Sequence, residues 1–210
     1  MLRASLVIVA YFGLILVSNQ AMGAECTITP QSSTVVIEGT ATRDNLIISG
    51  GTVPFIHLSL LCGNGQTVER DLDQYSFQTL LFNAGDGDDY FSNRTTKPAA
   101  AIMGAGNDSA YGKYGGQLFD GGAGDDGFQV SSDNNLSCLF QRGNTIIGGP
   151  GNDFIYSADK GTIPDLILMG PGADYVVVDA YTVVCGIADT RTKVADIVLD
   201  ASSEDTVLRR

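Results

Sequence analysis

A nine-residue pattern recurs five times between residues 84 and 177 of this 210-residue chain. Each copy has glycine at positions two and four, aspartate at position six and an apolar residue at position eight. The copies are Ala84–Ser92, Met103–Tyr111, Gly121–Gln129, Gly148–Tyr156 and Met169–Val177. A degenerate earlier copy, residues 39–47, keeps Asp44 and Leu46 but lacks both glycines. Internal repetition of this kind predicts stacked coils rather than a globular domain.

The spacing of the repeats predicts which edge of the stack they occupy. Successive position-six aspartates are 19, 18, 27 and 21 residues apart, and a coil made of two nonapeptides advances by about 18 residues. All five turns therefore fall on one edge. The opposite edge carries loops of varied composition around residues 93–98, 113–116 and 133–137.

The residue types in these turns suit a calcium ion. Calcium takes six to eight oxygen ligands, so several carbonyl and carboxylate oxygens must converge on one point. Alternating glycines permit positive φ values and leave no Cβ to block inward-pointing carbonyls. The aspartate supplies charge, and the apolar residue two places later faces a core. Whether the additional acids Asp86, Asp88 and Asp125 are also ligands is left open by the sequence.

The copies closely resemble the RTX, or haemolysin-type, calcium-binding repeat G-G-x-G-x-D-x-U-x, over about half of the chain that follows the N-terminal segment. The resemblance implies an all-β fold, a right-handed parallel β-roll or β-helix solenoid, in which calcium binds between successive turns. It implies that the ligands are position-six carboxylates and carbonyls of the turn glycines. These are Gly85, Gly87, Asp89, Gly104, Gly106, Asp108, Gly122, Gly124, Asp126, Gly149, Gly151, Asp153, Gly170, Gly172 and Asp174. About three or four calcium sites are expected.

The ends of the chain predict export and capping. Residues 1–23 have a basic start, a short apolar run and small residues at Ala21 and Gly23, typical of a cleaved secretory signal. An uncleaved membrane anchor is the alternative, and no later segment has the length of a membrane helix. We expect a strand-rich N-terminal cap with first coils at 24–82, the β-roll at 83–180, and degenerate coils or a cap at 181–210. An N-terminal signal and four cysteines depart from the usual RTX pattern.

The four cysteines predict two disulfides in an exported chain. Their order favours Cys26 with Cys62 and Cys138 with Cys185, although the other two pairings are also possible. No C-x-x-C pair is present, which argues against a zinc ribbon. Three N-glycosylation sequons begin at Asn93, Asn107 and Asn135, of which Asn107 lies within a repeat turn.

Charge and motifs narrow the function. The formal net charge is −12, from 24 acidic and 12 basic residues, so a nucleic-acid partner is disfavoured and cations are favoured. The single histidine, His57, has no acid near it in sequence, and the motifs H-E-x-x-H and G-x-S-x-G are absent. The chain is therefore expected not to be an enzyme. A polysaccharide-active β-helix would have to use the scattered charges Arg142, Asp159, Lys160, Asp189, Arg191 and Lys193.

Two classes of function remain. The first is a secreted, extracellular calcium-binding protein whose fold is stabilised by the ion. The second is a scaffold or adhesive surface that binds an extracellular protein, glycan or mineral.

Overall fold

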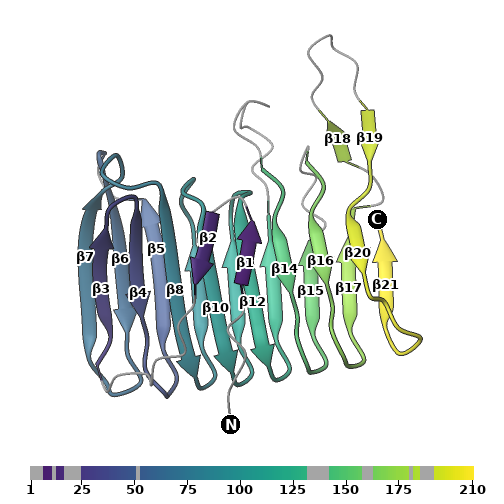
Figure 1. Cartoon of the computed structure of the whole chain (residues 1–210), viewed down its shortest axis with the longest axis horizontal. Helices are drawn as coiled ribbons and strands as arrows, with labels where there is room; N and C mark the ends of the chain where they lie inside the picture. Colours follow the sequence, from purple (N-terminus) through teal and green to yellow (C-terminus); the bar gives the residue numbers. More distant parts are fainter. Residues whose placement is uncertain are drawn as a thin grey trace.

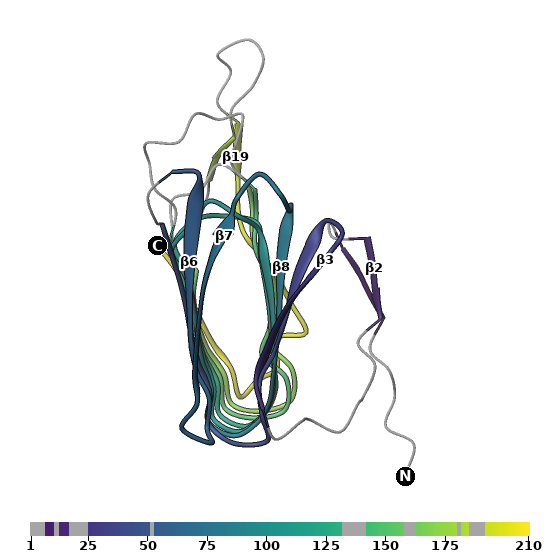
Figure 2. The ribbon, with the colours of Figure 1, turned by 90° about the vertical axis from the view of Figure 1, so that its left-hand side faces the viewer.

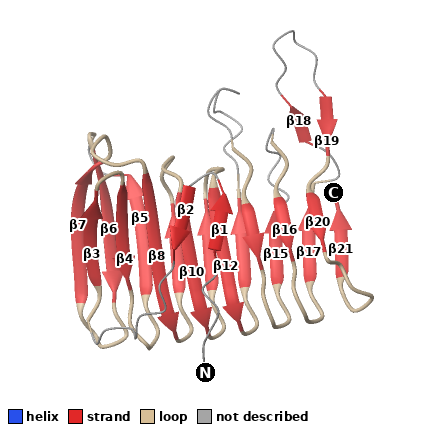
Figure 3. Ribbon diagram, viewed as in Figure 1, coloured by secondary structure: helices blue, strands red, loops and turns tan. Residues whose placement is uncertain are grey.

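Two β-sheets face each other across one apolar core (Figures 1 and 3). The computed structural model describes residues 7–10, 13–16, 25–50, 53–131, 142–157, 163–179, 182–184 and 192–210, which contain strands and no helix. In spatial order the eight-stranded sheet comprises β20 (Ile197–Leu199), β16 (Leu166–Leu168), β14 (Thr145–Ile147), β12 (Gln117–Ala123), β10 (Ala99–Ala105), β8 (Thr79–Asp86), β4 (Thr34–Glu38) and β3 (Thr27–Gln31). The nine-stranded sheet comprises β21 (Thr206–Arg209), β17 (Tyr175–Val178), β15 (Phe154–Ser157), β13 (Gly127–Val130), β11 (Ser109–Gly112), β9 (Tyr90–Asn93), β5 (Asn45–Gly50), β6 (Phe55–Leu61) and β7 (Thr67–Asp73).

Each coil contributes one strand to each sheet, and strands of successive coils pair in parallel. A short turn joins the two strands, such as residues 87–89 between β8 and β9 (Figure 2). These turns form the lower edge in Figures 1 and 2 and contain the aspartates of the nonapeptides. The predicted all-β, largely parallel, solenoid-like architecture is confirmed.

The position-eight residues form one inward row of the nine-stranded sheet. Phe91, Ala110 and Phe128 are register partners in successive coils and are buried. Facing them, Phe82 and Phe119 project from the eight-stranded sheet. Ring centroids are 5.9 Å apart for Phe82 and Phe91, and 6.0 Å apart for Phe119 and Phe128. The alternation of strand side chains therefore places one apolar ladder from each sheet in the core.

The N-terminal end is closed by antiparallel strands. β3 pairs antiparallel with β4, and β5, β6 and β7 form an antiparallel meander. A disulfide joins Cys26, just before β3, to Cys62, just after β6, with their Cα atoms 6.1 Å apart. The predicted Cys26–Cys62 staple is confirmed, whereas the expected Cys138–Cys185 pair lies outside the described residues.

At the other end, β20 and β21 form a further parallel coil next to β16 and β17. Two antiparallel pairs stand apart from the coils: β18 (Thr182–Val184) with β19 (Thr192–Val194), and β1 (Val7–Ala10) with β2 (Gly13–Leu16). The β1–β2 hairpin lies outside the eight-stranded sheet (Figures 1 and 2). Within the described residues, no helix has the length and hydropathy of a membrane span.

Candidate metal centre

The position-six aspartates form a continuous hydrogen-bonded ladder along the turn edge. In each step, the backbone N–H of one aspartate donates to Oδ1 of the aspartate in the next coil. The donor–acceptor distances are 2.6 Å for Asp44 to Asp89, 2.7 Å for Asp89 to Asp108, 2.8 Å for Asp108 to Asp126, 2.8 Å for Asp126 to Asp153, 2.8 Å for Asp153 to Asp174 and 3.0 Å for Asp174 to Asp205. The ladder therefore brings together all five aspartates that the repeat singled out, and extends by one residue at each end.

The second carboxylate oxygen distinguishes the five repeat aspartates from the two end residues. In each of the five repeat aspartates, Oδ2 is buried and accepts no hydrogen bond. These residues are Asp89, Asp108, Asp126, Asp153 and Asp174. A buried carboxylate oxygen without a donor is costly, because it has lost its water and gained no replacement. Five such oxygens in one row fit a set of ligands for a cation.

Backbone carbonyls line the same row. In the first four copies, the carbonyl oxygen of each position-two or position-four glycine lies against the corresponding glycine of the next copy, where a Cβ would come closer than 3.0 Å to it. At Gly124, for example, φ is +139°, and an added Cβ would collide with the carbonyl oxygen of Gly106. The glycines at positions two and four are thus required both by their backbone conformation and by the stacking of carbonyls along the solenoid.

Carboxylate and carbonyl oxygens from neighbouring coils converge at position one. A Cβ added at Gly121 would meet both Oδ2 of Asp126 and the carbonyl oxygen of Gly148, each closer than 3.0 Å. The same arrangement recurs at Gly148, with Asp153 and the carbonyl oxygen of Met169. Hard oxygen donors held together in this way are the ligand type that calcium selects.

Burial raises the pKa of every carboxyl group that has an open oxygen. The pKa of Asp89 rises to about 8 and that of Asp126 to about 7, while those of Asp108 and Asp153 rise to about 6. Neighbouring carboxylates in the turn edge add to this effect, and the pKa of Asp174 is also raised. A bound cation would favour the charged forms and reverse these shifts.

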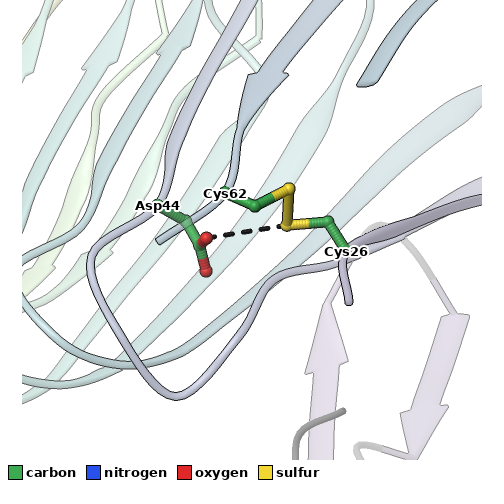
Figure 4. Close-up of side chains that lie close together, drawn as sticks. All are labelled: Cys26, Asp44 and Cys62. Carbon is green, nitrogen blue, oxygen red and sulfur yellow. Dashed lines mark hydrogen bonds between the residues drawn. A yellow bond between two sulfur atoms is a disulfide. The ribbon is translucent and has the colours of Figure 1, made fainter. Parts of the chain in front are cut away.

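The N-terminal end of the ladder is closed by protein donors. Oδ1 of Asp44 accepts hydrogen bonds from Gly63 N at 2.7 Å and from Thr40 Oγ1 at 3.2 Å, and Oδ2 accepts one from Thr40 N. Cys26 Sγ lies 3.6 Å from Oδ1 (Figure 4). Cys26, Asp44 and Cys62 lie close enough together to suggest a metal site, but the two sulfur atoms are bonded to each other. Asp44 thus caps the ladder and offers no open oxygen.

The C-terminal end is closed in the same way. Oδ1 of Asp205 accepts the Asp174 N–H, and Oδ2 accepts the backbone N–H of Ser202. The hydrogen bond from Asp174 lowers the pKa of Asp205. Among the seven ladder aspartates, the open carboxylate oxygens are therefore confined to the five full copies of the repeat; Asn45 and Asn83 also have a buried amide oxygen that accepts no hydrogen bond.

Position five forms a second, exposed ladder. The N–H of Asn107 donates to Asp88 Oδ1 at 2.8 Å, that of Asp125 to Asn107 Oδ1 at 2.9 Å, and that of Asn152 to Asp125 Oδ1 at 2.7 Å. Asp88 and Asp125 are thus engaged in stacking the coils on the solvent side. Ladders at positions five and six hold each turn against the next.

The opposite edge has a buried polar ladder that the sequence analysis missed. Along this edge, each residue donates a hydrogen bond to the side-chain oxygen of a residue in the next coil. The bonds are Asn93 Nδ2 to Gln117 Oε1 at 3.1 Å, Gln117 N to Asn144 Oδ1 at 3.0 Å, Asn144 N to Asp165 Oδ1 at 2.6 Å, and Asp165 N to Asp196 Oδ1 at 3.0 Å. Because Asn93 is fully buried and its amide nitrogen donates twice, it is not available as a glycan acceptor. The only sequence signal was a polar residue next to each strand of this edge.

Of the residues weighed for catalysis, the structure describes the side chains of His57 and Arg142 only. Across the β6–β7 pairing, Oδ1 of Asp71 lies 2.8 Å from Nδ1 of His57. The histidine therefore has an acidic partner that its neighbours in sequence do not reveal. Both side chains are exposed to solvent at the N-terminal end. Asp159, Lys160, Asp189 and Arg191 lie outside the described residues, as does the side chain of Lys193.

Comparison with models of protein families, with curated protein sequences and with solved structures finds no match for this chain.

Proposed function

We propose that this chain is a secreted calcium-binding protein with RTX-type turns on a right-handed parallel β-roll. Calcium binds between stacked turns, held by the position-six carboxylates and the turn-glycine carbonyls, and stabilises the fold. The single observation that carries the proposal is the row of five buried Oδ2 atoms that accept no hydrogen bond. The two ladder aspartates outside the full repeats, Asp44 and Asp205, have both oxygens bonded, so the open oxygens coincide with the repeat pattern.

The ion supplies positive charge and oxygen coordination to this row. The chain contributes the rest: the coil stacking places one carboxylate per step, and the carbonyl oxygens of Gly148 and Met169 lie near Oδ2 of Asp126 and Asp153. Magnesium fits less well, because it demands octahedral geometry at shorter distances and retains several waters. Removal of calcium leaves adjacent buried carboxylates without compensation, and stability falls.

A calcium titration of the purified chain, with its disulfides intact and after treatment with chelator, tests the proposal. We expect β-sheet circular dichroism and thermal stability to increase with calcium and not with magnesium. A site filled at one hundred times its Kd adds about 2.7 kcal/mol, which raises Tm by about 5–10 °C for a domain of this size. An unchanged Tm, or an equal response to magnesium, would contradict calcium binding at these turns.

A further inference from the structure

The outer face of the nine-stranded sheet carries aromatic side chains in two rows that contain no charged residue; Arg94 lies beside one row, where its Nε donates to Ser92 Oγ at 3.3 Å. Two outward rows cross its parallel strands from β5 to β21, and every residue in them is uncharged. Tyr90, Phe154 and Tyr175 belong to the first row, and Tyr111 and Tyr156 to the second. Two rows without a charged residue stand out in a chain with 24 acidic and 12 basic residues.

Two of these rings are exposed to solvent. Phe154 is 49 % exposed and Tyr175 is 38 % exposed. They are register partners, with ring centroids 5.6 Å apart and planes 4° from parallel. The other three are half-buried. In the described part of the chain, no strand layer covers this face, since the β1–β2 hairpin lies outside the other sheet (Figure 2).

Neutral hydrogen-bonding groups lie between the rings. Gln129 is exposed and is the register partner of both Tyr111 and Tyr156, and Ser109 is exposed beside Tyr90. The rows repeat at the strand spacing of about 4.8 Å. The face therefore offers alternating apolar and hydroxyl- or amide-binding surface along the solenoid axis.

This chemistry matches one class of partner. An aromatic ring packs against the C–H face of a sugar through apolar contact, while its amphipathic neighbours bond the sugar hydroxyls. An acidic glycan or nucleic acid would find one basic group here, Arg94 beside Ser92, and would be repelled by the net charge of −12. The charged cap strands limit the face at the N-terminal side, where Glu69 and Asp71 point outward from β7.

We infer that the outer face of strands β9 to β17 binds a neutral polysaccharide, with Phe154 and Tyr175 as its central contacts. The face is distinct from the aspartate turns, which lie at the edge of the sheet. Calcium contributes only by stabilising the coils that carry the rings. A protein that responds to calcium but binds no glycan would therefore contradict this inference and leave the proposed metal site intact.

Co-sedimentation of the calcium-equilibrated chain with cellulose, chitin and an insoluble β-1,3-glucan tests the inference, with soluble pectate and alginate as acidic competitors. We expect retention on at least one neutral polymer, and an apparent Kd at least tenfold weaker for the Phe154→Ala/Tyr175→Ala double variant. Tyr75→Ala is the matched control, because Tyr75 is 76 % exposed but lies in the turn after β7. It should bind like the wild type.

A second variant separates binding from folding. Gln129→Glu keeps the side-chain shape and all aromatic rings but places a carboxylate between Tyr111 and Tyr156, so it should weaken retention without lowering Tm. Absence of retention on all three neutral polymers overturns the inference. Retention that neither variant reduces, or preferential binding of the acidic polymers, overturns it as well.

Discussion

Replacing Asp126 by asparagine should stabilise the fold in the absence of calcium and destabilise it in the presence of calcium. Asp126 Oδ1 accepts the Asp108 N–H at 2.8 Å, and an asparagine oxygen can retain this bond. The open Oδ2 becomes an amide nitrogen, which faces the space that the carbonyl of Gly148 also lines. The substitution therefore removes a buried charge and one oxygen ligand while leaving the ladder in place.

The size of the effect follows from the carboxyl group's pKa. Burial raises the pKa of Asp126 from 3.8 to about 7 in the metal-free fold. A shift of about three units, at about 1.4 kcal/mol per unit, corresponds to about 4 kcal/mol of unfavourable ionisation at pH 8. Since the amide has its own cost of burial, we expect Asp126→Asn to raise the metal-free unfolding free energy by about 2–4 kcal/mol.

With saturating calcium the wild type should be more stable than the variant, because the variant lacks a ligand and the wild type no longer carries an uncompensated charge. Urea unfolding at pH 8, in chelator and in excess calcium, measures both effects. Asp205→Asn is the control within the same ladder: both oxygens of Asp205 accept hydrogen bonds, so its loss should destabilise the chain equally with and without calcium. An Asp126→Asn protein that is less stable than the wild type in chelator, or that gains as much stability from calcium, would contradict calcium coordination by Asp126.

Two further outcomes concern pH and the glycines. The folded-state pKa values of the open carboxyl groups are raised, so metal-free stability should be greatest in mild acid and fall as the pH rises through 6 to 8. Calcium should abolish this fall. A series of Tm measurements from pH 5 to 8 checks both outcomes. Gly124→Ala should abolish the calcium response and lower Tm more than Gly65→Ala. Both glycines have positive φ, but an added Cβ collides with Gly106 O only at Gly124, and Gly65 faces open space; equal losses of Tm would contradict a carbonyl row closed to side chains.

Much of the architecture was predictable because the repeat is periodic. Position eight predicted the inward ladder that contains Phe91 and Phe128, and position six placed the aspartates on one edge. The order of the cysteines favoured the Cys26–Cys62 staple over the two other possible pairings. These features depend on local chemistry that recurs at a fixed spacing, which a single sequence displays directly.

The closed ends of the ladder and the second polar edge were not predictable in the same way. Asp44 appeared as a degenerate repeat, and only the fold shows Gly63 and Thr40 satisfying its carboxylate. Asn144 and Asp165 are 21 residues apart, the same separation as Asp153 and Asp174, but they lie outside the nonapeptide and differ in residue type. A spacing without a recurring residue type did not mark this edge.

The unequal coils have a consequence for how the chain tolerates change. The connection between β9 and β10 is residues 94–98, and that between β11 and β12 is residues 113–116; both lie at the edge away from the aspartates. An insertion there lengthens a loop and leaves the strand register untouched if it keeps the bonds of Asn93 to Lys97 and Gln117. An insertion within an aspartate turn would displace ladder bonds on both sides. The edge away from the aspartates is thus suited to the insertion of foreign peptides, whereas the length of each aspartate turn has to be kept.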